Sequence, residues 1–380
     1  MSSNPFRFGD LVADDTFTDR EDELREVTAD ALNGQNVVIF APRRYGKSSL
    51  MKKVTRDLEA RDVLVARVDL MRTPNKERLA GHLARTIHAD LATKLFKAAE
   101  AARFVTGLRI APTVTVDPTD GSLQFGFESG RKASDVDATI ERLLELPARF
   151  ARERDRRVVF ILDEFQEIID IDPNLPALLR SVFQEQSEVA HIYLGSKRHM
   201  MQRIFNDENE PFWRSAKSIE LGTIPEAKFR SFIRERFDTT GRTIDDVVLD
   251  LVLSTTRCHP YATQQLSYFL WQEVADGGAA STESFVSAMG AVLRSENAHF
   301  ERIWEKASGV QKLVLSAVAR EPRSRPLGEE FRTRMGLGPA SSVQKALAVL
   351  TNDELIERTT DSTYQIAEPF LAEWIQRFQG

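Results

Sequence analysis

Residues 36–48 read NVVIFAPRRYGKS and give the strongest indication of how this chain folds. The first five residues, 36–40, form a β-branched apolar run that is too short for a helix and suits a buried strand. A basic loop with one glycine follows, and the pattern from Lys47 to about Ala60 predicts a helix. Main-chain N–H groups between a strand and a helix N-terminus can surround an anion, so this segment is a candidate anion site.

The loop has the pattern of a phosphate-binding loop, with Ala41 where that motif has its first glycine. Gly46 allows close approach of the backbone, Lys47 would reach the β- and γ-phosphates, and Ser48 would offer a hydroxyl to Mg²⁺. Alanine is compatible with position 41 if its φ stays negative. A basic turn without a ligand is the alternative interpretation. The residues expected to bind nucleotide here are Pro42, Arg43, Arg44, Tyr45, Gly46, Lys47, Ser48 and Ser49.

Length, composition and net charge limit the classes of protein to which this chain can belong. At about 150 residues per domain, 380 residues indicate about two to three domains. One cysteine, Cys258, excludes an internal disulfide and a multi-cysteine zinc site, and it fits a reducing compartment. The net charge of -6 argues against a protein coated in basic charge for nucleic acid. No signal peptide or membrane-spanning run is evident, so we expect a cytoplasmic protein without membrane contact.

Strands alternating with helices predict a doubly wound α/β domain with a parallel sheet over residues 1–223. Further strands are expected at 62–69 (DVLVARVD), 158–162 (VVFIL), 191–195 (HIYLG) and 217–221 (KSIEL). Two alternating segments flank a Pro-Thr-Asp-Gly turn at 118–121, which predicts a hairpin insertion at about 107–129. The hairpin either protrudes to bind a partner or covers the sheet.

Asp163 and Glu164 directly follow the most hydrophobic strand. Ligands of open α/β sheets bind at the carboxyl ends of the strands, so both acids are expected near the phosphate-binding loop. Asp163 would hold Mg²⁺, directly or through water, and Glu164 would polarise the attacking water. The alternative interpretation is that the two acids only begin a loop and have no catalytic role. The separation of residues 36–40 and 158–162 in sequence permits another strand to lie between them in space.

The remaining chain predicts two smaller parts. Residues 224–300 show only helical patterns and predict a helical lid domain. Residues 301–380 combine helices with two short strands and predict a winged-helix domain. The candidate recognition helix, 341–350, offers only Gln344 and Lys345 to bases. Acids interleave with the arginines before it, which favours protein contacts or internal packing over DNA.

The chain resembles the AAA+-type ATPases of the P-loop class, close to the predominantly archaeal ATPase family that borders the STAND signalling NTPases. The resemblance covers nearly the whole length. It rests on residues 17–24 (FTDREDEL), 41–48, 162–165 (LDEF), 194–196 (LGS) and 258–261 (CHPY).

The resemblance implies roles for five further residues. Phe17 and Arg20 would lie beside the adenine, and Ser196 would sense the γ-phosphate, where asparagine is usual. Arg214 lies where an arginine finger would reach a neighbouring subunit, although a surface arginine is the plainer interpretation. Pro260 matches the lid motif and would pack near the base.

Together these features predict a Mg²⁺-dependent ATPase with Glu164, Lys47 and Arg214 as its catalytic residues. We expect ATP hydrolysis to drive a conformational switch or scaffold that acts on a protein partner, with possible nucleotide-dependent homo-oligomers. The alternative is a DNA-associated ATPase that resembles origin-recognition proteins. A kinase is disfavoured, since no acceptor-binding motif is present and the acid pair suits attack by water.

Overall fold

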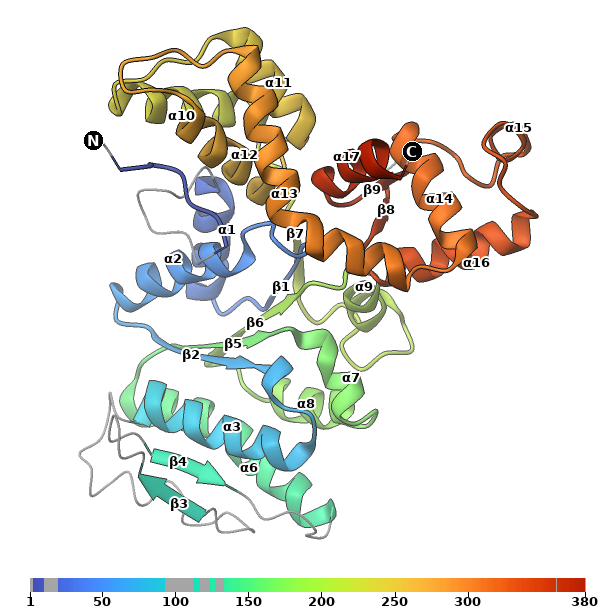
Figure 1. Cartoon of the computed structure of the whole chain (residues 1–380). Coiled ribbons are helices and arrows are strands. Elements are labelled where there is room, and N and C mark those ends of the chain that lie inside the picture. The colour runs from blue at the N-terminus through green and yellow to red at the C-terminus, as the bar shows by residue number, and fades with distance from the viewer. Residues whose placement is uncertain are drawn as a thin grey trace. The chain divides into compact units, whose positions relative to one another are not determined.

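The computed structural model contains two compact units (Figure 1). The residues that it describes are 3–9, 20–92, 113–116, 123–126, 133–359 and 361–379. The first unit, here called the sheet unit, consists of Arg20–Arg43 and Leu50–Leu221. The second, here called the helical unit, consists of Met1–Asp19, Arg44–Ser49 and Gly222–Gly380.

A five-stranded parallel sheet forms the centre of the sheet unit, which confirms the expected fold class. Its strands are β1 (Val37–Phe40), β2 (Leu64–Asp69), β5 (Val158–Asp163), β6 (Val189–Gly195) and β7 (Lys217–Glu220). Their spatial order is β2-β5-β6-β1-β7. A strand, β6, therefore lies between the strand before the basic loop and the strand before the acid pair.

Helices cover both faces of this sheet, so its central strands are buried throughout. Every residue of β1, β5 and β6 is buried, whereas edge strand β7 buries only Ile219. Figure 1 shows α1 on one side and α3, α6 and α8 on the other. The helices are α1 (Glu21–Leu32), α2 (Lys47–Glu59), α3 (Lys76–Ile87), α6 (Ala133–Arg154), α7 (Ile168–Ile171), α8 (Leu175–Phe183) and α9 (Arg198–Asn206). Short helical turns occur at Leu70–Arg72 (η2), His88–Ala92 (η3) and Phe165–Glu167 (η5).

The expected hairpin region contains two short antiparallel strands, β3 (Thr113–Val116) and β4 (Leu123–Gly126). Thr113 pairs with Gly126 and Val116 with Leu123. The rest of the segment at 107–129 lies outside the described residues, so its role as an insertion stays a prediction.

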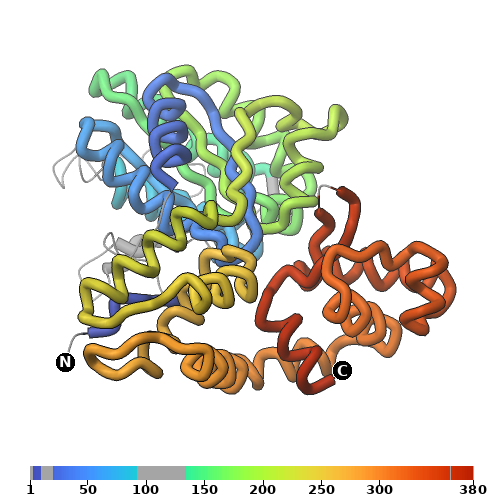
Figure 2. The backbone as a smooth tube through the Cα atoms, turned by 90° about the horizontal axis from the view of Figure 1, so that it is seen from above, coloured from blue at the N-terminus to red at the C-terminus, as the bar shows by residue number. Residues whose placement is uncertain are grey.

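The helical unit contains two groups of helices joined by the long helix α13 (Figure 2). The first group is α10 (Glu226–Thr239), α11 (Asp246–Thr256), α12 (Pro260–Glu273) and α13 (Thr282–Lys306). The second group is α14 (Gly309–Arg320), α15 (Glu329–Arg334), α16 (Ala340–Asn352) and α17 (Pro369–Phe378), with the antiparallel pair β8 (Ile356–Arg358) and β9 (Tyr364–Ile366). No helix in the described part of the chain has the length and apolar character needed to cross a membrane.

Local sequence fixes where these helices begin. Ser281 and Ser308 form capping boxes before α13 and α14, and Asp245 accepts a hydrogen bond from the Val248 N–H before α11. Such caps satisfy N–H groups that have no partner within the helix. Pro260 is the first residue of α12, where its missing N–H costs nothing.

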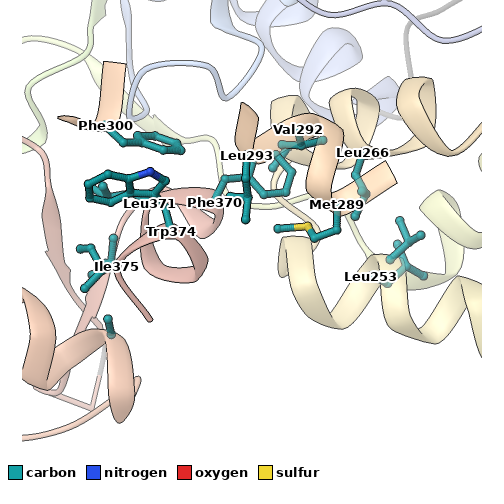
Figure 3. Packing of buried hydrophobic residues seen from close by; sticks show 14 of the residues in the cluster. Leu253, Leu266, Met289, Val292, Leu293, Phe300, Phe370, Leu371, Trp374 and Ile375 are labelled. Atoms are coloured by element: carbon teal, nitrogen blue, oxygen red, sulfur yellow. The ribbon is translucent and has the colours of Figure 1, made fainter. Parts of the chain in front are cut away.

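One hydrophobic core runs through the helical unit from α10 to α17. Figure 3 shows Phe300 of α13 beside Trp374 of α17, with ring centroids 6.1 Å apart, and Phe370 near Leu293. Because α13 continues to Lys306, residue 300 lies inside a helix and the two helical groups share buried side chains. The separate domains 224–300 and 301–380, like the boundary at 223, stay predictions about organisation.

A buried histidine in the sheet makes stability depend on pH. His191 of β6 packs against Phe183, with ring centroids 4.1 Å apart, and burial lowers its pKa from 6.5 to about 3. Between these values only the unfolded chain binds a proton at residue 191. The free energy of unfolding should therefore fall as the pH is lowered through this range, by at most roughly 1.4 kcal/mol per pH unit from this group.

Urea unfolding at about pH 7 and about pH 5 checks this linkage. His191→Gln keeps a donor for the Oδ1 atom of Asn36, which accepts a bond from the ring at 3.3 Å, and should lose part of the pH dependence. The matched change at the exposed His199 should leave that dependence intact. Equal pH dependence in wild type and His191→Gln would contradict the prediction.

Candidate functional site

Three neighbouring strands end at one edge of the sheet and bring the predicted polar residues together there. Glu164 follows β5, Ser196 follows β6, and Ala41 follows β1. The Ala41 N–H donates to the Gly195 carbonyl at 3.3 Å, so the basic loop leaves the sheet beside the end of β6. Ser196 therefore lies at the end of the strand next to that of Asp163, because β6 pairs with β5.

The Glu164 carboxylate accepts two hydrogen bonds on one oxygen. Ser196 Oγ donates to Oε2 at 2.7 Å, and Gln166 Nε2 donates to the same atom at 2.6 Å. The backbone of Glu164 adopts the left-handed conformation, with φ 51° and ψ 47°, which non-glycine residues rarely adopt outside functional sites and turns. Glu164 is thus fixed by both its backbone and its side chain.

Asp163 is the last residue of β5 and is nearly buried. Its Oδ1 atom accepts the Glu164 N–H at 3.0 Å, and its Oδ2 atom forms an ion pair with Arg67 of β2. A buried carboxylate needs a compensating positive charge, and here the guanidinium supplies it.

Two residues of the basic loop, Arg44 with φ 68° and Gly46, adopt the left-handed backbone conformation, and only glycine favours it. Gly46 has φ 88°, which favours glycine, whereas Ala41 does not have a positive φ. The substitution of the usual first glycine by alanine is therefore compatible with this loop. Pro42 is half-buried and Arg43 is exposed.

Helix α2 begins at Lys47, inside the predicted motif. Lys47 and Ser49 are buried and Ser48 is half-buried. The first turn of α2 contains no acidic residue, so the positive end of the helix is not neutralised there by its own side chains. The N–H groups of this turn point away from the helix and can bind an anion.

Within the helical unit, two loop residues contact the start of α12 and the residue before α17. The Arg44 guanidinium forms an ion pair with Glu368 at 3.0 Å and lies over the Tyr261 ring, 4.3 Å from its centroid. The Tyr45 ring meets the His259 ring edge to face, with centroids 4.6 Å apart. Burial lowers the pKa of His259 to about 3, so its imidazole is neutral at pH 7.

Other predicted residues occupy different places. Phe17 lies outside the described residues. Arg20 directly precedes α1, is buried, and forms an ion pair with Glu23 at 2.7 Å, so its contact with adenine stays a prediction. Pro260, half-buried at the start of α12, and Arg214, exposed over the Trp213 ring at 5.1 Å, also keep only predicted roles.

Sequence reasoning missed three contributors. Gln166 lies two residues after Glu164, yet nothing in its surroundings sets it apart from other loop glutamines. Arg67 gave a signal, since it is the charged residue inside the apolar run LVARVD of β2. Nothing in the sequence indicated a role for Glu368, because its partner Arg44 lies 324 positions away in the chain.

Comparison with solved structures agrees with this fold. A Walker-type ATPase of Pyrococcus abyssi is 15% identical, with 96% of this chain and 97% of that chain covered at a TM-score of 0.64. The ORC2 protein of Aeropyrum pernix, solved as ADPNP-ADP complexes, is 15% identical over 94% of this chain and 93% of its own, with a TM-score of 0.56. A search of curated proteins gave no match.

Family models give the more specific result. Residues 298–377 match a probable winged helix domain. Residues 17–266 match the model described as the ATPase domain predominantly from Archaea, and this match spans more than half of the chain. The chain therefore belongs to this predominantly archaeal ATPase family, and it is a P-loop ATPase with a C-terminal winged helix.

Proposed function

We propose that this ATPase binds ATP with Mg²⁺ at the carboxyl edge of its sheet and uses hydrolysis to drive a conformational switch that acts on a protein partner. The observation that carries the proposal is the Glu164 carboxylate, held by Ser196 and Gln166 beside Asp163. The loop that follows β1 leaves the sheet at this same edge.

In this proposal, the loop residues from Pro42 to Ser49 bind the phosphates through main-chain N–H groups, side chains and the N-terminus of α2. Lys47 neutralises charge on the β- and γ-phosphates. Ser196 contacts the γ-phosphate, while Phe17 and Arg20 lie beside the adenine and Pro260 near the base. The lid motif around His259 supports this assignment, since its ring contacts Tyr45 of the loop.

The residue types of the proposed donor set fit a magnesium ion. Asp163 offers carboxylate oxygens and Ser48 a hydroxyl, and both are the hard oxygen ligands that Mg²⁺ prefers. Asp163 Oδ1 already accepts the Glu164 N–H and Oδ2 pairs with Arg67, so Asp163 would hold the ion through its remaining lone pairs, directly or through water. When bound, Mg²⁺ neutralises charge on the β- and γ-phosphates.

Glu164 then acts as the base. A water molecule attacks the γ-phosphorus, the bond from that phosphorus to the β,γ-bridging oxygen breaks, and the carboxylate receives a proton from the water. The products are ADP and phosphate. The hydrogen bond from Gln166 holds the carboxylate in one orientation during this step, because the Ser196 hydroxyl has one hydrogen and would then donate it to the γ-phosphate.

The contacts of the loop support a switch. Arg44 and Tyr45, inside the phosphate-binding motif, contact Glu368 and His259 of the helical unit. A ligand shifts a conformational equilibrium only if it binds the two conformations differently. Phosphates that displace Arg44 or Tyr45 would change these contacts, and with them the helical unit that would meet the partner.

A matched pair of variants tests the nucleotide site. Lys47→Ala should lose tight ATP binding, because it removes the cation that is proposed to reach the β- and γ-phosphates. Glu164→Gln should keep ATP binding and lose turnover by roughly 10²–10⁴-fold, as general-base catalysis contributes about that much. Binding is measured with a fluorescent nucleotide, and phosphate release is measured without an added acceptor. Full affinity in Lys47→Ala, or full turnover in Glu164→Gln, would refute the respective role.

Arg214 would act only if another subunit presents it to the site, so we also propose nucleotide-dependent self-association. The protein should increase in mass with a non-hydrolysable ATP analogue, and Arg214→Ala should lose turnover while still assembling. Light scattering coupled to size exclusion measures the mass. A monomer that turns over ATP at the same specific rate at every protein concentration would remove Arg214 from the mechanism.

DNA binding through the winged helix is the second candidate, favoured by the match to a probable winged helix domain. An ion pair in this domain argues against DNA binding. Arg334 pairs with Glu321, so its positive charge is less available to DNA phosphates. We therefore expect no salt-dependent binding of duplex DNA even at low salt. Fluorescence anisotropy with a labelled duplex measures this, and affinity that falls steeply with added salt would favour the DNA-associated ATPase.

A further inference from the structure

Gln166 is a buried residue next to the carboxyl edge of the sheet. It lies in the turn η5, directly after Glu164 and Phe165, and its side chain is fully buried. The Phe165 ring fixes this turn, since its centroid lies 4.7 Å from that of Tyr193 and 5.1 Å from that of Phe212. The turn that carries Gln166 is thus held by the packing of the Phe165 ring.

The amide donates to two carboxylates at once. Nε2 lies 2.6 Å from Glu164 Oε2 and 3.2 Å from Glu167 Oε1, and Lys197 pairs with the same Glu167 oxygen at 3.1 Å. Carboxylates accept and do not donate, so the NH₂ group must face them and both of its hydrogens are used. This assignment fixes the direction of the amide.

The carbonyl oxygen of the Gln166 amide does not contribute to the stability of the fold. Gln166 Oε1 is buried without a hydrogen-bond partner among the described residues. The space around it depends on Gly195, where an added Cβ would lie 2.8 Å from Oε1. An apolar side chain of similar size would avoid the unsatisfied oxygen, so the amide is better explained by what its NH₂ group does.

We infer that Gln166 is a positioning residue for hydrolysis: it orients the Glu164 carboxylate toward the attacking water. The inference rests on the proposed function, in which Glu164 is the base. Ser196 and Gln166 donate to the same oxygen, so together they fix the rotation of the carboxylate. A displacement of about 1 Å at a reacting group can cost roughly 10²-fold in rate.

The test compares Gln166→Met with a matched control. Methionine keeps the length of the side chain and removes both donors. We expect kcat to fall roughly ten- to hundredfold while ATP affinity stays unchanged. The control is Gln186→Met, since Gln186 is also buried with an unpartnered Oε1 and donates to the Leu144 carbonyl away from the edge. It should leave kcat unchanged.

A second measurement separates positioning from a purely structural role. In the Glu164→Gln background, Gln166→Met should lower the single-turnover rate no further, because the group that it positions is already gone. An equal loss in both backgrounds would overturn the inference. So would full kcat in Gln166→Met if Glu164→Gln is inactive. Full turnover in Glu164→Gln would instead refute the base, and thus the proposed function itself.

Discussion

Burial of the parallel sheet on both faces is the constraint on which the rest of this structure depends. The central strands β1, β5 and β6 are buried along their whole length, and apart from His191 and Tyr193 of β6 their polar side chains lie where the strands end. Because neighbouring parallel strands end at one edge, Asp163, Glu164 and Ser196 lie together there. The packing that stabilises the sheet therefore places these three polar side chains together at its carboxyl edge.

The loop after β1 has two structural roles. Its flanking segments belong to the sheet unit, whereas Arg44–Ser49 belong to the helical unit. Arg44 and Tyr45 use their side chains for contacts with Glu368 and His259. The main-chain N–H groups of the loop and the start of α2 are the groups that phosphates would use. In the proposed function, a nucleotide would thus use the main chain of the loop in which the side chains of Arg44 and Tyr45 contact Glu368 and His259.

Much of this arrangement follows from residues close together in the sequence. The strand before Ala41 and the helix from Lys47 were both predictable, because each depends on local propensity. The pairing of Arg67 with Asp163 was not, since 96 positions separate them. Arg44 and Glu368 are further apart still, and no periodicity links two such residues.

By itself the sequence determined the class of the fold, the phosphate-binding motif and the acid pair, because the spacing of apolar, glycine and charged residues specifies each locally. Only the tertiary structure decided that β6 lies between β1 and β5 and that Gln166 reaches the Glu164 carboxylate. It also joined the two helical groups through one core. The physical reason is that strand order, side-chain direction and shared burial depend on contacts between distant segments, which a local pattern does not encode.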